Sequence, residues 1–376
     1  MKAIFSRIAD FFRESDKLLL FLCIVATSYG CLSVFTTTYY KENLRPVIIQ
    51  TLCMFLGLFA AIVISLFDYE KYLKYWYLFL SVGVILVILT FFIGIAPEGT
   101  DDKAWLDLGV TTLQPSELLK ISFILSFSFH LNKVKDNINK FKTLIPICIH
   151  GAFPIILIHL QGDDGTALVF LVMVLFMMWA AGVSWKYFLI AFSSALAASP
   201  IIYFFLMNED QRERVKMLFN IEADIQGIGY QQWRGRVALA NGGWFGQGFL
   251  KGDLTQAGVI PESHNDFIFC SIGEEFGLIG CLLVIILLGA ICLRCIRIAR
   301  ICTNNSGKYI CVGVFSMLFA QSVINIGMCT SVLPVIGVTL PFFSSGGTSL
   351  LCLYFGMGLA LNVYKHRNSR TLYLRD

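Results

Sequence analysis

Runs of about 20 consecutive apolar residues recur along this chain, and they constrain its fold more than any other feature. An α-helix of about that length crosses the hydrocarbon core of a bilayer. Of the 376 residues, 57% are hydrophobic and 14% are charged, whereas a soluble domain has roughly 25% charged residues. Helices satisfy their own backbone hydrogen bonds in lipid. The chain is therefore predicted to be an all-α polytopic integral membrane protein.

The apolar runs predict ten transmembrane helices, near residues 18–36, 46–67, 75–95, 113–131, 143–160, 167–182, 186–207, 266–292, 309–331 and 348–364. Once these spans are placed, most of the 29 Lys and Arg residues fall in loops on one side. Basic loops remain cytoplasmic, so both termini are expected to be cytoplasmic. The net charge of +4 reflects this bias and gives no argument for nucleic-acid binding.

Two segments outside the spans have a predicted role. Residues 1–17 lack the apolar core and cleavage site of a signal peptide, and their apolar side chains share one helical face. This pattern predicts a cytoplasmic amphipathic helix on the membrane surface. Residues 18–376 are predicted to form one ten-span membrane domain. Its long outer loop, 208–265 between spans seven and eight, is expected to be ordered as short amphipathic helices.

The 12 cysteines lie in or beside spans or on the inner side, so a disulfide framework is not expected. Cys292 and Cys295 have the spacing of a metal-binding pair, but no second pair follows at the distance of a zinc site. Small buried hydrophobes are the favoured interpretation of these residues.

Ionisable residues inside a span are costly and usually functional. In "LQPSELLK", Pro115 suits the first position of a helix, with Gln114 as N-cap and Glu117 in the first turn. An acid there also satisfies the helix dipole. Lys120 lies three residues on, on the same face. Two interpretations stay open: a purely structural ion pair, or a pair that lines a site.

A second polar cluster, "PESHNDFIFCSIGEEFG", leads into the eighth span. Asp266 is expected to start the helix, and its structural interpretation is an N-terminal acid with Ser263 or Asn265 as cap. The two acids about two turns later cannot both face lipid, so this span borders a polar cavity or other helices. That favours a site at Asp266. His264 lies two residues before it, a spacing too common to indicate a metal site.

Two other polar stretches fall at predicted outer ends of spans. In "QGDDGTA", Asp163 and Asp164 lie in a tight turn, for which solvation is the default expectation. In "LPFFSSGGTSL", residues 340–350, a Gly-Gly break precedes the last span. It predicts irregular backbone that lines a cavity, away from lipid, with Ser344 inside it.

Five segments resemble, in this order, the signature segments of the SEDS (shape, elongation, division and sporulation) family: "WLDLGVTTLQPSELLK", "QGDDGTA", "GYQQWRGRVALANGGWFGQGF", "PESHNDFIFCSIGEEFGLIG" and "NIGMCTSVLPVIGVTLPFFSSGGTS". The likeness covers nearly the whole chain. Within the family, "NIGM" and "LPVIGV" are more similar to the rod-shape branch than to the division branch, which implies a role in cell elongation.

The resemblance implies a peptidoglycan glycosyltransferase that polymerises lipid II on the outer face of the bacterial cytoplasmic (inner) membrane. It also implies a partner, a class B penicillin-binding protein that cross-links the strands. The family's catalytic aspartate corresponds to Asp266, its Glu–Lys pair to Glu117 and Lys120, and the aspartate of its "PDLGT" motif to Asp163.

The chain departs from the family pattern at four places. Ala104 stands where the family has Arg, "QGDDGT" where it has "QPDLGT", Arg234 and Gly235 where it has Gln and Ser, and Ser345 where it has Tyr. These changes leave the catalytic aspartate and the ion pair intact. They put the contacts with the substrate, above all with its diphosphate, in doubt.

The implied product is inverted at the donor anomeric carbon, which requires a single displacement with one general base. Asp266 is the candidate base. The leaving lipid diphosphate needs positive charge, from Arg212, Arg214, Arg234, Arg236 or Lys251. A divalent cation, Mg²⁺ or Mn²⁺, held partly by Asp266 is the alternative source. The other residues expected to bind substrate or line the site are Gln114, Glu117, Lys120, Asp163, Arg214, His264 and Ser344.

Two other classes of function fit the same composition. One is a transporter that flips the lipid-linked precursor, and the other is a non-catalytic scaffold for the penicillin-binding protein. A transporter places its polar residues near the midplane, whereas here they gather at the outer ends of the spans. This distribution favours chemistry at the membrane surface.

Overall fold

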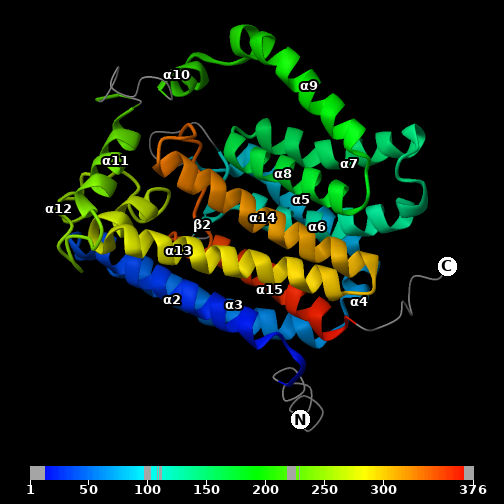
Figure 1. Cartoon of the computed structure of the whole chain (residues 1–376), viewed down its shortest axis with the longest axis horizontal. Coiled ribbons are helices and arrows are strands. Elements are labelled where there is room, and N and C mark those ends of the chain that lie inside the picture. Colours follow the sequence, from blue (N-terminus) through cyan, green and yellow to red (C-terminus); the bar gives the residue numbers. More distant parts are fainter. Residues whose placement is uncertain are drawn as a thin grey trace.

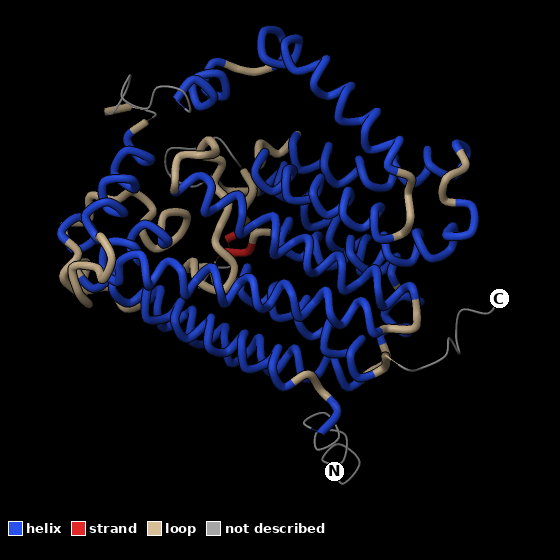
Figure 2. Tube along the Cα trace, viewed as in Figure 1, coloured by secondary structure: helices blue, strands red, loops and turns tan. Residues whose placement is uncertain are grey.

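The computed structural model describes residues 13–96, 103–107, 109, 112–217, 226–227 and 229–367. Residues 1–12, which make up most of the predicted N-terminal surface helix, lie outside these ranges. The described chain is almost entirely helical (Figure 2).

A helix occupies each of the ten predicted span positions: α2 (Lys17–Tyr39), α3 (Arg45–Leu66), α5 (Trp76–Ile93), α6 (Pro115–Val134), α7 (Phe141–His159), α8 (Asp164–Ala180), α9 (Trp185–Ile201), α13 (Ile268–Ile301), α14 (Asn305–Cys329) and α15 (Gly347–Lys365). Eight helices of the described chain are long and apolar enough to cross a membrane. The other two positions hold α8, a shorter apolar helix, and α6, which carries Glu117, Lys120 and Lys133. The chain is thus an all-α polytopic protein with about eight to ten spans.

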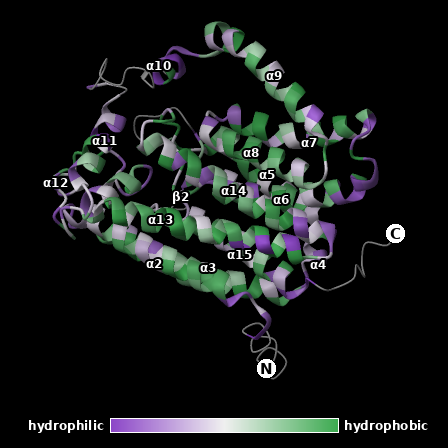
Figure 3. Ribbon diagram, in the orientation of Figure 1, coloured by the Kyte–Doolittle hydropathy of each residue, from purple (hydrophilic) through white to green (hydrophobic). Residues whose placement is uncertain are grey.

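Successive spans run in alternate directions through the bundle (Figure 1). The centre consists of α3 packed on α15, α13 packed on α14 and α2, and α14 packed on α6 and α8. Small residues allow the closest approach: a Cβ at Gly358 would lie 2.8 Å from the Cα of Ala61. Apolar residues dominate the helices and polar ones gather at their ends (Figure 3).

One span stands apart from this bundle. The helix α9 continues as a π-helical turn, η2 (Ile202–Leu206), and neither contains a buried residue. Figure 1 shows α9 as an arm beside α7 and α8. Pro200 removes one backbone donor near its end, and the wider turn follows directly.

The long loop between α9 and α13 contains helices, as predicted. These are α10 (Glu209–Met217), α11 (Tyr230–Gly242) and α12 (Asp253–Gln256). The sequence did not predict the small antiparallel hairpin of β1 (Leu106–Asp107) and β2 (Thr112–Leu113), shown red in Figure 2. The short helix α4 (Tyr69–Lys74) and the 3-10 turn η1 (Lys135–Asn137) both lie at the ends of the spans away from this hairpin.

The eighth span differs from the prediction at both ends. It begins at Ile268 rather than Asp266 and continues to Ile301 rather than 292. The residues before it form turns, because the Phe267 amide bonds back to the Glu262 carbonyl. Its last turns stay helical where Arg294 pairs with the buried Asp16. A non-helical residue, Gly277, interrupts it.

Candidate functional site

Asp266 lies in a turn whose backbone is held from two directions. The amide of Asn325 on α14 donates to the Asp266 carbonyl at 2.9 Å and also to the Val338 carbonyl at 2.7 Å. The Cys329 thiol donates to the Asp266 carbonyl at 3.4 Å. Asn325 and Cys329 are both fully buried. The peptide that carries Asp266 is therefore fixed to the end of α14.

The segment before α15 holds the two preceding residues. The Ser344 hydroxyl donates to the Asn265 carbonyl and accepts from the Leu340 amide, both at 2.7 Å. The Ser345 amide donates to the His264 carbonyl at 2.8 Å. The predicted irregular backbone before the last span is therefore real. Ser344, predicted to contact substrate, has both of these hydrogen bonds within the protein.

The carboxylate of Asp266 is half-buried and makes no hydrogen bond or ion pair within the described part of the chain. Gly337, with a φ of 66°, passes beside it: a Cβ there would lie 3.7 Å from Oδ2. Burial, followed by the charges of Glu262 and Asp163, raises the pKa of Asp266 to about 7. Such a carboxylate is a stronger base than an ordinary aspartate and is half ionised near pH 7.

The alternative interpretation, in which Asp266 is an N-terminal acid of α13 and Ser263 or Asn265 is its cap, is wrong. The N-cap of α13 is Phe267, without a side-chain capping bond. Asn265 donates its side-chain amide to Glu262 at 2.7 Å, so neither Asn265 nor the buried Ser263 is the cap. Asp266 therefore lies outside the first turn of α13, and its carboxylate makes no capping hydrogen bond within the described residues.

Asp163 is a buried helix cap rather than a solvated turn residue. Its Oδ1 accepts the Thr166 amide at 2.8 Å, and its Oδ2 accepts Gln114 Nε2 at 2.9 Å. This links the first turns of α6 and α8. The charge of Asp163 acts on Asp266, so the structure brings Gln114, Asp163 and Asp266 to the same end of the bundle.

The Glu117–Lys120 pair is confirmed. Lys120 Nζ lies 2.8 Å from Glu117 Oε1, and the two side chains are 1% and 4% exposed. As predicted, Pro115 starts α6 and Gln114 is its N-cap. The pair begins less than one turn beyond Gln114, and Glu117 Oε2 has no hydrogen-bond partner in the described chain. Within the described residues, no hydrogen bond or ion pair joins the pair to Asp266.

The acids within the eighth span border other helices. Glu274 accepts the amides of Leu254 and Thr255 at 2.9 and 2.8 Å. Glu275 accepts Gln256 Nε2 at 2.8 Å. Both carboxylates therefore hold α12 onto α13 and do not belong to the site.

The predicted cations differ in their surroundings. Arg212 donates twice to the Met207 carbonyl, whereas Arg214 donates to the Val335 carbonyl at 3.0 Å, two residues before Gly337. The remaining candidates are Arg234, which lies over the Tyr230 ring, Arg236, which is exposed, and Lys251, which is exposed.

The sequence prediction missed Lys41 and Gln50. The pKa of His264 is lowered, chiefly by burial; the Glu262 carboxylate opposes this shift and the charge of Lys41 adds to it. Lys41 therefore lies close enough to act on the site electrostatically. Gln50 donates to the Ser344 carbonyl at 3.0 Å and accepts the Gly346 amide at 3.2 Å. The signal that the sequence offered was Gln50 itself, a polar amide side chain within an apolar span.

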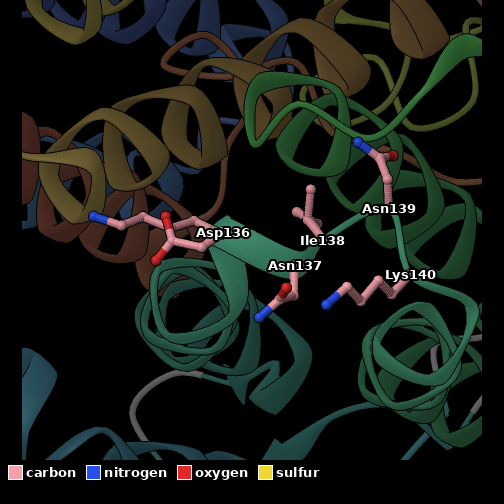
Figure 4. A pocket seen from close by; sticks show the side chains of 6 residues that line it. Asp136, Asn137, Ile138, Asn139 and Lys140 are labelled. Carbon is pink, nitrogen blue, oxygen red and sulfur yellow. The ribbon is translucent and has the colours of Figure 1, made fainter.

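No group of three or more His, Cys, Asp or Glu side chains in the described ranges could hold a metal ion. A shallow hollow of about 240 Å³ lies at η1, at the far end of α6 from Gln114 (Figure 4). It is separate from the Asp266 site and is lined by Lys135, Asp136, Asn137, Ile138, Asn139 and Lys140.

Comparison with known proteins places this geometry in context. The FtsW/RodA/SpoVE family model, described as "Cell cycle protein", matches residues 16–369. The peptidoglycan glycosyltransferase MrdB of Escherichia coli K12 is 34% identical over 299 residues, 80% of this chain and 79% of that protein. The probable peptidoglycan glycosyltransferase FtsW of Geobacter metallireducens is 31% identical over 356 residues, 93% of this chain and 94% of that protein.

Two solved structures share the fold. One, described as "Structural coordination of polymerization and crosslinking by a peptidoglycan synthase complex", matches with a TM-score of 0.82 and 26% identity over 95% of this chain and 99% of the other. The rod shape determining protein RodA of Thermus thermophilus matches with a TM-score of 0.70 and 23% identity, over 95% of this chain and 98% of that one.

Proposed function

Because this chain belongs to the SEDS family and is a multi-pass membrane peptidoglycan glycosyltransferase that polymerises glycan strands, we propose that it joins lipid II units at the membrane surface beside Asp266. Asp266 acts as the general base. The observation that carries this assignment is a half-buried carboxylate that has no protein partner in the described chain, with a pKa of about 7, on a backbone fixed by Asn325 and Cys329.

The reaction is a single displacement. The acceptor sugar hydroxyl attacks the donor anomeric carbon, and its proton passes to Asp266 as the new C–O bond forms. The bond from the anomeric carbon to the lipid diphosphate breaks, and the electron pair leaves with the diphosphate. The diphosphate is a good leaving group, so a second carboxylic acid is unnecessary.

Positive charge near the leaving group lowers the barrier. Arg214 and Lys41 are our candidates, since one contacts the segment that passes Asp266 and the other acts on His264. Gln114 and Asp163 border the site, while Glu117 and Lys120 form its floor. We assign no step to Mg²⁺ or Mn²⁺.

The basic loops indicate how the protein lies in the membrane. Lys71, Lys74, Lys133 and Arg294 lie at the ends of the spans away from Asp266. By the distribution of basic residues we place those ends and both termini in the cytoplasm, and Asp266 on the outer face. There the chain works with a class B penicillin-binding protein in cell elongation. In support, one structural relative is described as part of a peptidoglycan synthase complex.

The test is polymerisation of purified lipid II by the wild-type protein and Asp266→Asn, each with and without the partner. Asp266→Asn should fold but make no glycan. Asp253→Asn, which alters an exposed carboxylate of the same outer loop, is the matched control and should remain active. Normal polymerisation by Asp266→Asn would refute the general base. A wild-type protein that moves lipid II across vesicles without polymerising it would be a transporter.

A further inference from the structure

The break in α13 is hydrogen-bonded to the loop that follows α11. At Gly277, φ is 68° and ψ is −166°, so the helical hydrogen-bond ladder is interrupted there. Figure 1 shows α11 beside this end of α13. Four backbone hydrogen bonds join the loop to the break: Leu278 N to Gly243 O at 2.9 Å, Ile279 N to Trp244 O at 3.3 Å, Gln247 N to Glu274 O at 2.9 Å and Gly248 N to Glu275 O at 3.0 Å.

This junction lies near the end of the apolar part of α13 on the Asp266 side, because Gln256 bonds both Glu275 and the Thr36 carbonyl in the last turn of α2. At the opposite end, Arg294 is the first charged residue of the helix after Glu275. About 20 apolar residues fill the hydrocarbon core, and counting back from Arg294 reaches Glu274. This count places residues 276–279 just inside the hydrocarbon of one leaflet.

The loop is compatible with that depth. Non-helical backbone is tolerated there only when its polar groups are paired within protein, and the four bonds to α13 pair two donors and two acceptors. Residues 237–250 contain no charged side chain. Close approach depends on glycine, because a Cβ at Gly242 would collide with the Gly273 carbonyl and one at Gly246 with the Glu275 carbonyl.

The tip of the loop carries aromatic side chains that no described residue covers. Trp244 is 69% exposed and Phe245 is 81% exposed. The neighbouring residues of α13, Leu278 and Ile279, are also exposed and belong to the face of a span that contacts lipid. The two aromatic residues thus extend an apolar face that is already at the bilayer.

We propose that α11 and residues 243–248 form a re-entrant element that inserts Trp244 and Phe245 among the acyl chains of the leaflet on the Asp266 side. Arg236, exposed and six residues before Gly242, lies about 9 Å along the helix, where it meets the phosphate groups of that leaflet. The insertion goes beyond the catalytic assignment and does not depend on Asp266 as the base.

The test is tryptophan fluorescence of the full-length protein in nanodiscs made from lipids with brominated acyl chains, compared with unbrominated lipids. Trp244→Phe removes the tip fluorophore. Trp233→Phe, at the half-buried start of α11, is the matched control. The emission lost between wild type and Trp244→Phe should be strongly quenched by brominated lipid and insensitive to aqueous iodide, whereas the Trp233 component should be less affected by bromine.

Each other outcome contradicts the insertion. Quenching of the Trp244 component by iodide would place the loop in water. Protection from both quenchers would place Trp244 against protein, such as a second copy of the chain. Neither result would bear on polymerisation by Asp266, so the two assignments fail separately.

Discussion

The pKa of Asp266 gives the sharpest prediction about the proposed mechanism. With a pKa of about 7, roughly a tenth of these carboxyl groups are ionised at about pH 6, half at about pH 7 and nine tenths at about pH 8. The general base works only when ionised. The initial rate of lipid II polymerisation should therefore rise about tenfold between about pH 6 and pH 8 and then level off.

A neighbouring carboxylate offers a test of the cause. Glu262 contributes to the raised pKa of Asp266, so Glu262→Gln should move the midpoint of the rate profile to lower pH. The assay measures initial rates on saturating lipid II at constant ionic strength. A rate that is flat across this range would refute the argument, because an ordinary aspartate is ionised throughout. A midpoint unchanged in Glu262→Gln would refute the electrostatic cause.

The same pKa predicts how stability depends on pH. A raised pKa in the folded state means that the ionised form of Asp266 destabilises the fold. Relative to Asp266→Asn, the wild type should therefore lose stability as the pH rises from about 4 to about 7, and the two should converge below about pH 4. The shift of about three units sets an upper limit of about 4 kcal/mol, reduced by the partial exposure of the side chain. Thermal unfolding in detergent measures the difference.

Four other substitutions test the framework around the site. Glu117→Gln or Lys120→Met alone should each lower the free energy of unfolding by about 3–5 kcal/mol, because each leaves a buried charge unpaired. Thermal melts should show a smaller loss for the double variant, and strictly additive losses would argue against pairing. Ser344→Ala should cost about 1–3 kcal/mol and lower the polymerisation rate without abolishing it; unchanged kinetics would show that its two backbone bonds do not position the base. Gly246→Ala, at a φ of 79° and against the Glu275 carbonyl, should cost at least about 1–3 kcal/mol, seen as faster hydrogen exchange at the break in α13.

Local pattern was enough for the spans and for some of their ends. Apolar runs of about 20 residues predict helices because lipid leaves the backbone no other partners. The start of α6 was also predictable, since Pro115 and the acid after it act within one turn. The Glu117–Lys120 pair needed only the helical period, because residues three apart lie on one face.

Contacts between distant segments decided the rest. Asp163 was expected in a solvated turn, but Gln114, 49 residues away, covers it as part of a cap. Asp266 was expected to start a helix, but bonds from α14 and from the segment before α15 hold it in a turn. These partners lie 59 and 79 residues away from the atoms they bind, beyond any periodic signal.

The sequence by itself determined that the chain crosses the membrane repeatedly and that the candidate site residues lie at one end of the bundle, since both follow from hydropathy and helix length. Tertiary structure alone decided which carboxylates accept hydrogen bonds from the protein and which one does not. Glu274, Glu275 and Asp163 accept hydrogen bonds from neighbouring segments, while Asp266 accepts none through its side chain within the described residues. A carboxylate's basicity depends on these neighbours, and only the folded chain brings them together.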